Sequence, residues 1–425
     1  MKLSFSALLF SFLFLLFFLQ GTQASNKTRQ PINPNSRITV FLDTENWFDS
    51  DFVRQQIPVV NYVRDREQAD VHIIVTRHSA GTAGTNYAIS FIGNRAFLGI
   101  NNEFTYWAPT TNSSDDTRRG YTNIIKIGLV SYLSSTPMID RVLVDFFQDP
   151  KDTLEKYQEA IETDPWNSWV FELYGGGNFG KEEKLSHFSF RTGFFADRVT
   201  TEWKIRLRPY FNFNNRTFVT SEEDIVSSTH RHGYAAYVVK SITDHWSVGL
   251  FSSGLSSTFH NINFNADLVP AVEWSLFPYN EATRRSVTLA YRMGYGYNNY
   301  IETTIFDKDE EWIWAQSLEA TVRFQQPWGN VRAGLTGSHF INDLSMNRAQ
   351  VFTNLNLRIV QGLSLNFFVN YEIINDLIAI PKGNRTIEQI LLARTQQATS
   401  YSISGSVGLS YTFGSKFSVA YNPRL

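Results

Sequence analysis

The feature that most constrains this chain is an alternation of apolar and polar residues that recurs from Trp166 onward. In residues 363–373 every odd-numbered position is apolar or aromatic, and most even-numbered positions are Ser, Asn or Glu. Residues 203–213 and 401–413 largely follow the same rule. A period of two sustained over about ten residues describes a β-strand that has one apolar and one polar face along its whole length.

Segments of this kind are too long for an ordinary soluble β-sandwich. Strands in soluble proteins average ~5–6 residues, whereas a strand that crosses a bilayer needs ~9–11. Twelve segments meet the longer figure, and bacterial single-chain barrels have an even number of strands. The segments are approximately 168–180, 184–197, 201–218, 228–241, 245–259, 261–277, 285–300, 312–325, 329–342, 347–360, 363–377 and 396–414. The pattern therefore predicts a mainly β protein, with a transmembrane antiparallel β-barrel of about 12 strands over residues 167–414.

The aromatic content supports the same fold. Aromatic residues make up 15% of the chain and charged residues 18%, yet the mean hydropathy is −0.23. Tryptophans concentrate near the segment ends, where the interfacial girdles of a membrane barrel lie. These are Trp166, Trp169, Trp203, Trp246, Trp274, Trp312, Trp314 and Trp328. Alternation explains the low mean hydropathy, because each lipid-facing residue has a polar neighbour that faces the lumen.

The connections between the segments differ in length on the two sides. Bacterial barrels have short periplasmic turns and longer outer loops. Short turns are expected near 199–200, 243–244, 279–284, 327–328 and 361–362, and longer polar loops near 219–228, 301–311 and 378–395. From Trp166 onward the chain thus resembles the outer-membrane β-barrel proteins of Gram-negative bacteria. Such barrels commonly end on a terminal aromatic residue, whereas here a C-terminal tail, 415–425, follows Phe413.

The first residues predict export. Residues 1–24 have the form of a secretory signal peptide, with Lys2 before a 15-residue apolar run from Phe5 to Leu19 and small residues before the cleavage site at Ala24. The run is shorter than the ~18–20 residues of a spanning helix. The chain has no cysteine, which excludes disulfides and thiolate metal sites and favours a bacterial envelope over an exported eukaryotic protein.

Residues 36–149 mix both hydrophobic periods and predict a small periplasmic α+β domain. Strands are expected at 38–42, 71–75 and 87–91, with a strand or loop at 97–107 and a last strand at 142–146. A helix is expected over Phe52 to Val63, and a second one after a cap at Ser113, Ser114 or Asp115, ending before Pro137. The order of elements resembles the N-terminal domain of the Tol-system propeller protein. A linker, 150–166, with a polar helical stretch at 154–161, leads to the barrel.

The polar strand faces predict what lines the lumen. Eight basic residues are expected to point inward and form a lumen track: Arg191, Lys204, Arg206, Arg208, Arg292, Arg323, Arg332 and Arg358. Six acidic residues share those faces: Glu172, Glu202, Asp267, Glu273, Glu319 and Glu372. One interpretation is a basic track for small anions or acidic oligosaccharides. The other, which the near balance of charge favours, is a lattice of ion pairs that closes the pore.

Few residues suggest catalysis, a cofactor or a metal. The Gly-x-Ser-x-Gly pattern of a nucleophile elbow is absent, and His230 and His232 lack a third ligand. The acidic run 307–311 lacks the cadence of a calcium loop, and Gly81 to Gly84 form a hairpin turn without a following helix. The cluster Asp43, Glu45, Asp49 and Asp51 follows a strand end and is interpreted first as helix capping. The chain is therefore predicted to be no enzyme, with no cofactor and no bound metal.

The charge balance narrows the partners. Lys and Arg number 38 and Asp and Glu 40, without the basic excess of a nucleic-acid binder. The leading hypothesis is an outer-membrane β-barrel that anchors a periplasmic domain for docking an envelope protein and passes small solutes. The alternative is a dedicated channel or transporter for small anionic or saccharide solutes, gated by the N-terminal domain. An outer-membrane hydrolase ranks third, because no nucleophile has a partnered base.

Overall fold

The computed structural model describes residues 37–45, 47–79, 81–142, 164–219, 224–383 and 398–414. Two sheets make up the described chain, a small sheet of five strands and a long sheet of twelve. Four predicted features lie outside the described residues: the signal peptide, the strand at 142–146 beyond its first residue, the linker helix at 154–161 and the C-terminal tail.

The small sheet belongs to an N-terminal unit, residues 37–142. Its strands are β1 (Thr39–Asp43), β2 (Asn61–Tyr62), β3 (Val71–Ser79), β4 (Gly84–Gly93) and β5 (Asn101–Pro109). Their order in space is β2-β1-β3-β4-β5; β1 is parallel to β2 and β3, and the other pairs are antiparallel. Its helices are α2 (Ser50–Gln56) and α3 (Ser114–Leu133), with short 3₁₀ turns η1 (Arg66–Gln68), η2 (Gly81–Ala83), η3 (Arg95–Phe97) and η4 (Pro137–Arg141).

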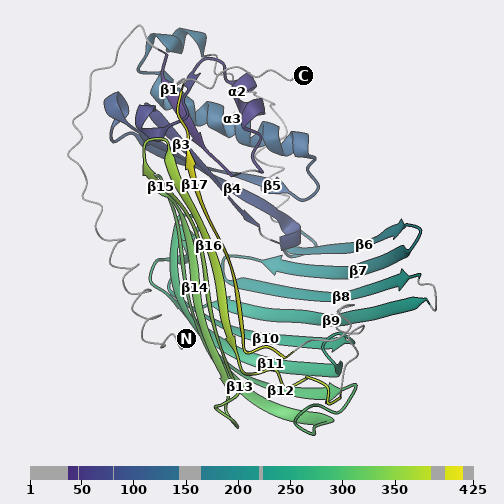
Figure 1. The fold of residues 1–425 in the computed structure, drawn as a ribbon. Coiled ribbons are helices and arrows are strands. Elements are labelled where there is room, and N and C mark those ends of the chain that lie inside the picture. Colours follow the sequence, from purple (N-terminus) through teal and green to yellow (C-terminus); the bar gives the residue numbers. More distant parts are fainter. Residues whose placement is uncertain are drawn as a thin grey trace.

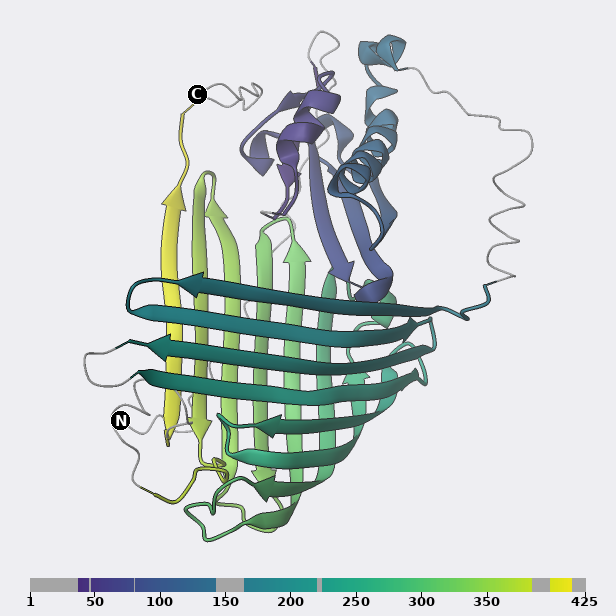
Figure 2. The ribbon, with the colours of Figure 1, turned by 90° about the vertical axis from the view of Figure 1, so that its right-hand side faces the viewer.

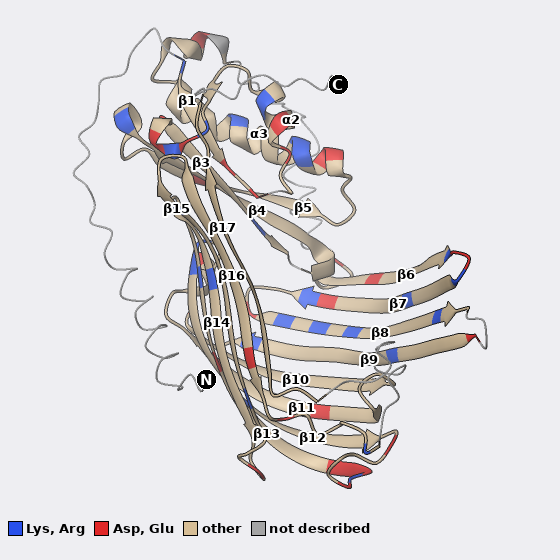
Figure 3. Ribbon diagram, in the orientation of Figure 1, with Lys and Arg blue, Asp and Glu red and all other residues tan. Residues whose placement is uncertain are grey.

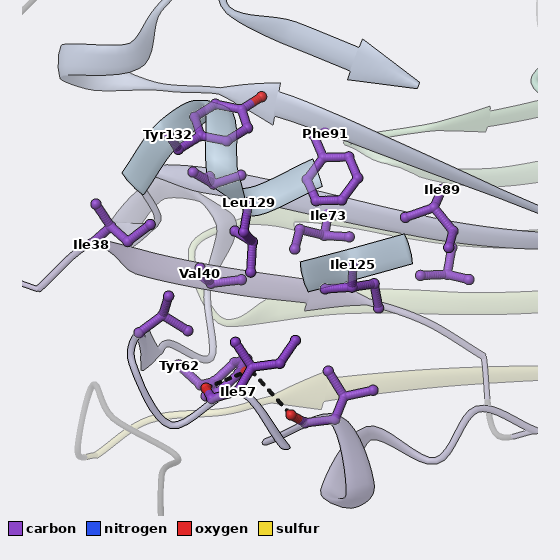
Figure 4. Packing of buried hydrophobic residues seen from close by; sticks show 14 of the residues in the cluster. Ile38, Val40, Ile57, Tyr62, Ile73, Ile89, Phe91, Ile125, Leu129 and Tyr132 are labelled. Carbon is purple, nitrogen blue, oxygen red and sulfur yellow. Dashed lines mark hydrogen bonds between the residues drawn. The ribbon is translucent and has the colours of Figure 1, made fainter. Parts of the chain in front are cut away.

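Helix α3 covers one face of the small sheet and completes its core. Ser113 caps the helix in a reciprocal capping box with Asp116, which satisfies two backbone donors of the first turn. Ile125, Leu129 and Tyr132 recur on one face and are at most 1% exposed. Figure 4 shows these residues gathered against the strands of the sheet. The N-terminal unit thus buries its apolar residues within itself.

The predicted helix over residues 52–63 is wrong beyond its first turns. Helix α2 ends at Gln56, and Ile57 leaves the helical region with φ −129° and ψ 64°. Pro58 explains the end, because its ring lacks an N–H and restricts the preceding residue to extended conformations. Val60 and Val63 are buried all the same, on either side of the short strand β2. Their helix-like spacing therefore comes from burial of a segment that is not helical.

The long sheet has all twelve predicted strands. They are β6 (Trp169–Lys181), β7 (Leu185–Val199), β8 (Trp203–Phe218), β9 (Ile225–Ser241), β10 (Trp246–Ser257), β11 (Ile262–Ser275), β12 (Arg285–Tyr300), β13 (Glu310–Gln326), β14 (Gly329–Phe340), β15 (Asn347–Val360), β16 (Leu363–Ile374) and β17 (Tyr401–Tyr411), with the 3₁₀ turn η5 (Tyr279–Glu281) between β11 and β12. Each strand pairs antiparallel with its neighbours in sequence. The prediction of a mainly β chain with twelve long antiparallel strands is confirmed.

The long sheet curls around an interior. Figure 2 shows the teal strands β6–β9 running across the green and yellow strands β13–β17. Backbone pairing is continuous from β6 to β17, and the described residues show no pairing between these two edge strands. Among the described helices, none has the length and apolar character needed to cross a membrane.

The two faces of the long sheet differ as the alternation predicts. The outer face exposes large apolar residues such as Leu268, Leu318 and Trp312, which are 51%, 50% and 57% exposed. Aromatic rings stack on that face, with Tyr295 4.9 Å from Trp312 between ring centroids. The polar residues occupy the inner face. Figure 3 shows the basic residues of β8 as a row along the strand.

The N-terminal unit lies at the end of the long sheet where the turns are short (Figure 1). That end carries the β7–β8, β13–β14 and β15–β16 turns, and the first residues of β6. The turn between β15 and β16 contacts the unit directly, because the Gly362 N–H donates to Asp65 over 3.0 Å. The turn between β11 and β12 does so through Arg284, whose Nη1 lies 3.5 Å from Glu103 Oε2. The candidate site is built at this junction.

Candidate functional site

The first strong contact across the junction joins Asp43 and Arg358. Asp43 is the last residue of β1, and Arg358 lies near the end of β15. The guanidinium binds both carboxylate oxygens, with Nη2 2.5 Å from Oδ1 and Nη1 on Oδ2. The same guanidinium lies over the Phe41 ring, 4.8 Å from its centroid. A bidentate pair of this kind fixes orientation as well as distance.

His72 also bonds to the Asp43 carboxylate. Its Nε2 lies 3.0 Å from Asp43 Oδ2, and the side chain is 2% exposed. Burial lowers the pKa of His72 against the opposing hydrogen bond to Asp43, so a neutral imidazole donates its Nε2–H to the carboxylate. Burial alone would raise the pKa of Asp43, but hydrogen bonds from His72 and Arg358 outweigh it and hold that pKa below its usual value. Asp43 is therefore an anion.

The second strong contact centres on Asp197, whose side chain is fully buried. Its Oδ2 accepts from the Thr82 N–H over 3.0 Å and from Arg208 Nη2 over 3.0 Å, while Arg206 Nε lies 3.5 Å from Oδ1. Thr82 also donates its hydroxyl to the Val170 carbonyl, 3.4 Å away. The turn η2 thus inserts into the inner wall of β6 and β7.

Gly81 makes that insertion possible. Its φ is +74°, and a Cβ at this position would lie 2.0 Å from Asp197 Oδ2. Any side chain would collide with the carboxylate, and the left-handed backbone also disfavours one. The turn from Gly81 to Gly84, predicted as a hairpin turn, therefore has a contact role that its sequence alone does not reveal.

A polar cavity of about 600 Å³ lies where the N-terminal unit meets strands β13 to β17 of the long sheet. The N-terminal unit contributes Glu45 and Arg77 to it, and the long sheet contributes Arg323 and Arg332. Five amide side chains line it as well: Gln325, Asn330, Asn354, Asn356 and Asn366. The remaining lining is mostly apolar: Phe324, Val331, Phe352, Leu355, Phe367, Phe368 and Ser406. A neighbouring space of about 570 Å³ shares several of these residues and reaches Asp43 and Arg358. We call the first space the junction cavity.

The junction cavity carries an excess of positive charge. Arg323 and Arg332 stand directly opposite each other on β13 and β14, and neither forms an ion pair with a described carboxylate. Arg77 stacks over Trp47, 4.7 Å from the ring centroid, and Glu45 accepts from Trp47 Nε1 over 2.9 Å. Burial, and then the charge of Arg323, lower the pKa of the nearby His78.

The structure distributes the eight predicted track residues over several places on the inner face. Lys204, Arg206 and Arg208 follow one another along β8, with Lys204 Nζ 5.9 Å from the Tyr237 ring centroid. Four of the eight are held by carboxylates: Arg206 and Arg208 by Asp197, Arg292 by Glu319, and Arg358 by Asp43. Arg323 and Arg332 line the junction cavity, and Arg191 forms no ion pair with a described residue. Whether they guide solutes stays a prediction.

The predicted inner acidic residues are in part bonded to the wall. Glu319 pairs with Arg292, and Glu372 lies 3.4 Å from Arg348. Asp267 accepts from the Ser253 N–H and hydroxyl, and Glu273 accepts from the Tyr279 hydroxyl. Bonds of this kind are expected if the inner charges form a lattice of ion pairs. The junction cavity is the feature expected if they form a track for solutes. Glu172 and Glu202 take no part in either group.

Sequence reasoning missed the two carboxylates that form the junction. Capping was the first interpretation of the acidic cluster, and it is correct for Asp49, which caps α2 over 3.0 Å from the Phe52 N–H. It is wrong for Asp43, which binds Arg358. Asp197 was not named at all, although it shares the parity of Arg191 on β7. That parity could have placed it on the inner face.

The other candidate groups lie apart from the junction. His230 and His232 stack on each other 5.7 Å apart, in register with Phe213 and Phe211, and no group of three potential metal ligands occurs among the described residues. In the acidic loop, Asp307 pairs with Lys382, and Asp309 accepts from the Thr303 hydroxyl over 2.6 Å.

Comparisons with known proteins add one structural likeness. Fold and pairing define the chain as a twelve-stranded antiparallel β protein that carries a small α+β unit at one end of its sheet. No protein-family model matches the chain, and no curated protein matches it. Among solved structures it is similar to the NanC porin in its rhombohedral crystal form, with 10% identity and a TM-score of 0.27. The likeness covers 58% of this chain and 99% of the porin chain.

Proposed function

We propose that this chain is a channel-like β-barrel protein of the Gram-negative outer membrane, whose N-terminal unit lies in the periplasm and closes the mouth formed by the short turns. The exposed apolar outer face and the polar inner face support a barrel in lipid. The signal-peptide pattern and the lack of cysteine support the location. In this proposal the chain is a channel for small anionic or saccharide solutes and performs no catalysis.

The observation that carries the proposal is the insertion of η2 against Asp197. A carboxylate with no exposed surface is held by two guanidinium groups of the long sheet and by a backbone N–H of the N-terminal unit. The two ion pairs lie within the long sheet, and the bond that crosses the junction comes from the Thr82 N–H. A hydrogen bond to a charged group contributes ~1.5–3 kcal/mol. A unit tied in this way is a closing element, whereas a docking domain needs only a tether. This favours the gated channel over the partner-docking hypothesis.

A cysteine pair tests the closure, because the chain has no cysteine of its own. Thr82 and Val170 are bonded across the junction, and Val170 stands opposite Asp197 on β6. In the variant Thr82→Cys with Val170→Cys, oxidation to a disulfide should lock the unit in place while leaving Asp197 intact. We expect low conductance in planar bilayers when locked, and the conductance of the unmodified chain after reduction. The single variant Thr82→Cys is the matched control.

Deleting residues 25–150 separates the two hypotheses. The gated channel predicts a conductance that rises or becomes steady when the unit is removed. Unchanged permeability, together with the loss of a co-purifying envelope protein, would instead support docking. Heat-modifiable gel mobility of the full chain tests the barrel itself, and a chain that stays in solution without detergent would contradict it.

A further inference from the structure

The junction cavity has features of a binding site. We propose that it binds a small organic anion, with a carboxylate or phosphate held by Arg323 and Arg332 and hydroxyl groups held by the surrounding amides. We further propose that the bound anion favours the closed arrangement. The binding does not depend on the proposed channel function, whereas the effect on closure rests on it.

The charge arrangement is the first argument. Arg323 and Arg332 are exact cross-strand partners, so two like charges face each other on neighbouring strands. Like charges directly opposite each other destabilise a sheet unless an anion lies between or beside them. Arg77 adds a third cation from the N-terminal unit, against the single carboxylate of Glu45. Guanidinium forks match the oxygens of carboxylate and phosphate groups.

The lining and size are the second argument. A volume of about 600 Å³ falls within the range typical of small-molecule sites, ~300–1,000 Å³. Asparagine and glutamine side chains offer both donors and acceptors, which suits hydroxyl groups on a polyhydroxylated solute. Arg332 lies over the Phe352 ring, 5.5 Å from its centroid, and this contact holds the guanidinium at the cavity wall. The chemistry indicates a sugar acid or a sugar phosphate.

The position of the cavity is the third argument. Glu45 and Arg77 come from the N-terminal unit, while Arg323 and Arg332 come from the long sheet. An anion that contacts both parts binds the closed arrangement better than one in which they separate. By linkage, such a ligand must shift the chain toward closure by the same factor by which closure raises its affinity.

Binding is tested by titration calorimetry on the full chain in detergent micelles. The probes are D-glucuronate, D-glucose 1-phosphate and neutral D-glucose. We expect saturable binding of at least one anion and no binding of glucose. The anion that binds more tightly shows whether the site prefers a carboxylate or a phosphate. Arg323→Gln and Arg332→Gln should each weaken that binding about tenfold. Saturation by neither anion, or equal binding of glucose, would overturn the proposal.

Arg231→Gln is the matched control. Arg231 lies on the polar face of β9 over the Tyr210 ring, 5.8 Å from its centroid, as Arg332 lies over Phe352. Anion affinity should change by less than about twofold in this variant. If affinity falls as much as in Arg332→Gln, anion binding depends on the overall charge of the inner face and not on a specific site. Glu45→Gln provides a second readout, because removing the competing carboxylate should tighten binding. Weaker binding in Glu45→Gln contradicts the proposed arrangement.

The effect on closure is read from the rate at which Thr82→Cys with Val170→Cys cross-links. A saturating anion should raise that rate roughly fivefold or more. Binding with an unchanged rate refutes the coupling and leaves the site. If the cross-link abolishes conductance but no anion binds, the binding site is refuted and the proposed function stands.

Discussion

The two sheets treat their apolar faces in opposite ways. In the N-terminal unit Ile73 and Ile89 of the small sheet are fully buried under α3. In the long sheet Leu268 and Leu318 are about half exposed on the outer face. No described helix covers that face, so its apolar surface needs an apolar surrounding. The difference shows that one sheet is stabilised by its own core, and we infer that the other is stabilised by lipid.

The junction is where the two kinds of sheet meet, and it is held by charge. Asp43 binds Arg358 across the boundary. Asp197 is paired within the long sheet and accepts from the Thr82 N–H across the boundary. Variants that disturb one sheet, the other or the junction should therefore have separable effects.

The largest effect is expected for Asp197→Asn. The change leaves Arg206 and Arg208 without their carboxylate, which should cost the long sheet ~3–5 kcal/mol. It also makes the bond from the Thr82 N–H a neutral one, which should weaken docking by about 1 kcal/mol. The measurement is hydrogen exchange of the η2 amides in the full chain. Asp267→Asn is the control, because the Asp267 carboxylate accepts hydrogen bonds from Ser253 of the long sheet, away from the junction. Unchanged η2 protection in Asp197→Asn would contradict the closing role.

Next comes a test of the small sheet's core. Leu129→Ala removes a side chain that is 1% exposed and should lower the stability of the N-terminal unit by ~2–5 kcal/mol through the cavity it leaves. Ile127→Ala on the same helix changes a 55% exposed residue and should have an effect within ~0.5 kcal/mol. Thermal unfolding followed by hydrogen exchange measures both. Heat-modifiable mobility of the long sheet should be the same in the two variants, and a loss of it in Leu129→Ala would show that the sheets fold as one.

The matching test of the long sheet is Leu318→Arg. A charge on the outer face of β13 should cost ~2–4 kcal/mol if this face lies at the middle of a bilayer. Thr336→Arg is the control, because Thr336 stands opposite Glu319 on the inner face. Urea titration of the folded chain in lipid vesicles measures the difference. Equal stability of the two variants would contradict a lipid-facing outer surface.

Much of the architecture could be predicted from local pattern. The strands of the long sheet follow from alternation alone, because each residue of so long a strand lies on either the apolar or the polar face. The end of α2 could have been predicted too, since Pro58 cannot continue a helix. Helix α3 follows from its cap, predicted at Ser113, Ser114 or Asp115 and found at Ser113.

The junction could not be predicted in the same way, because its contacts join residues far apart in the chain. Asp43 pairs with a residue 315 positions away, and Thr82 bonds with one 115 positions away. Parity predicts an inward-facing Arg358, but no periodicity shows which carboxylate will reach it. The inserted turn was visible only as glycines and threonine, which are typical of any hairpin.

The smallest effect, and the one that separates the two sheets by pH, concerns the histidines of the N-terminal unit. The pKa values of His72 and His78 are lowered from 6.5, in both cases first by burial. A base with a lowered folded pKa contributes stability that is complete above 6.5 and declines as the pH falls below it, because the unfolded chain then binds more protons. The depressed pKa of Asp43 adds a second decline, which begins only below its ordinary value of 3.8. Thermal unfolding of the full chain between pH 7.5 and pH 5 should therefore show a falling midpoint for the N-terminal unit, which has two such histidines. The long sheet should show a smaller decline, because burial lowers the pKa of one described histidine there, His260. In His72→Gln with His78→Gln the slope over this range should be much smaller, and a slope equal to that of the unaltered chain would assign the pH dependence to other groups.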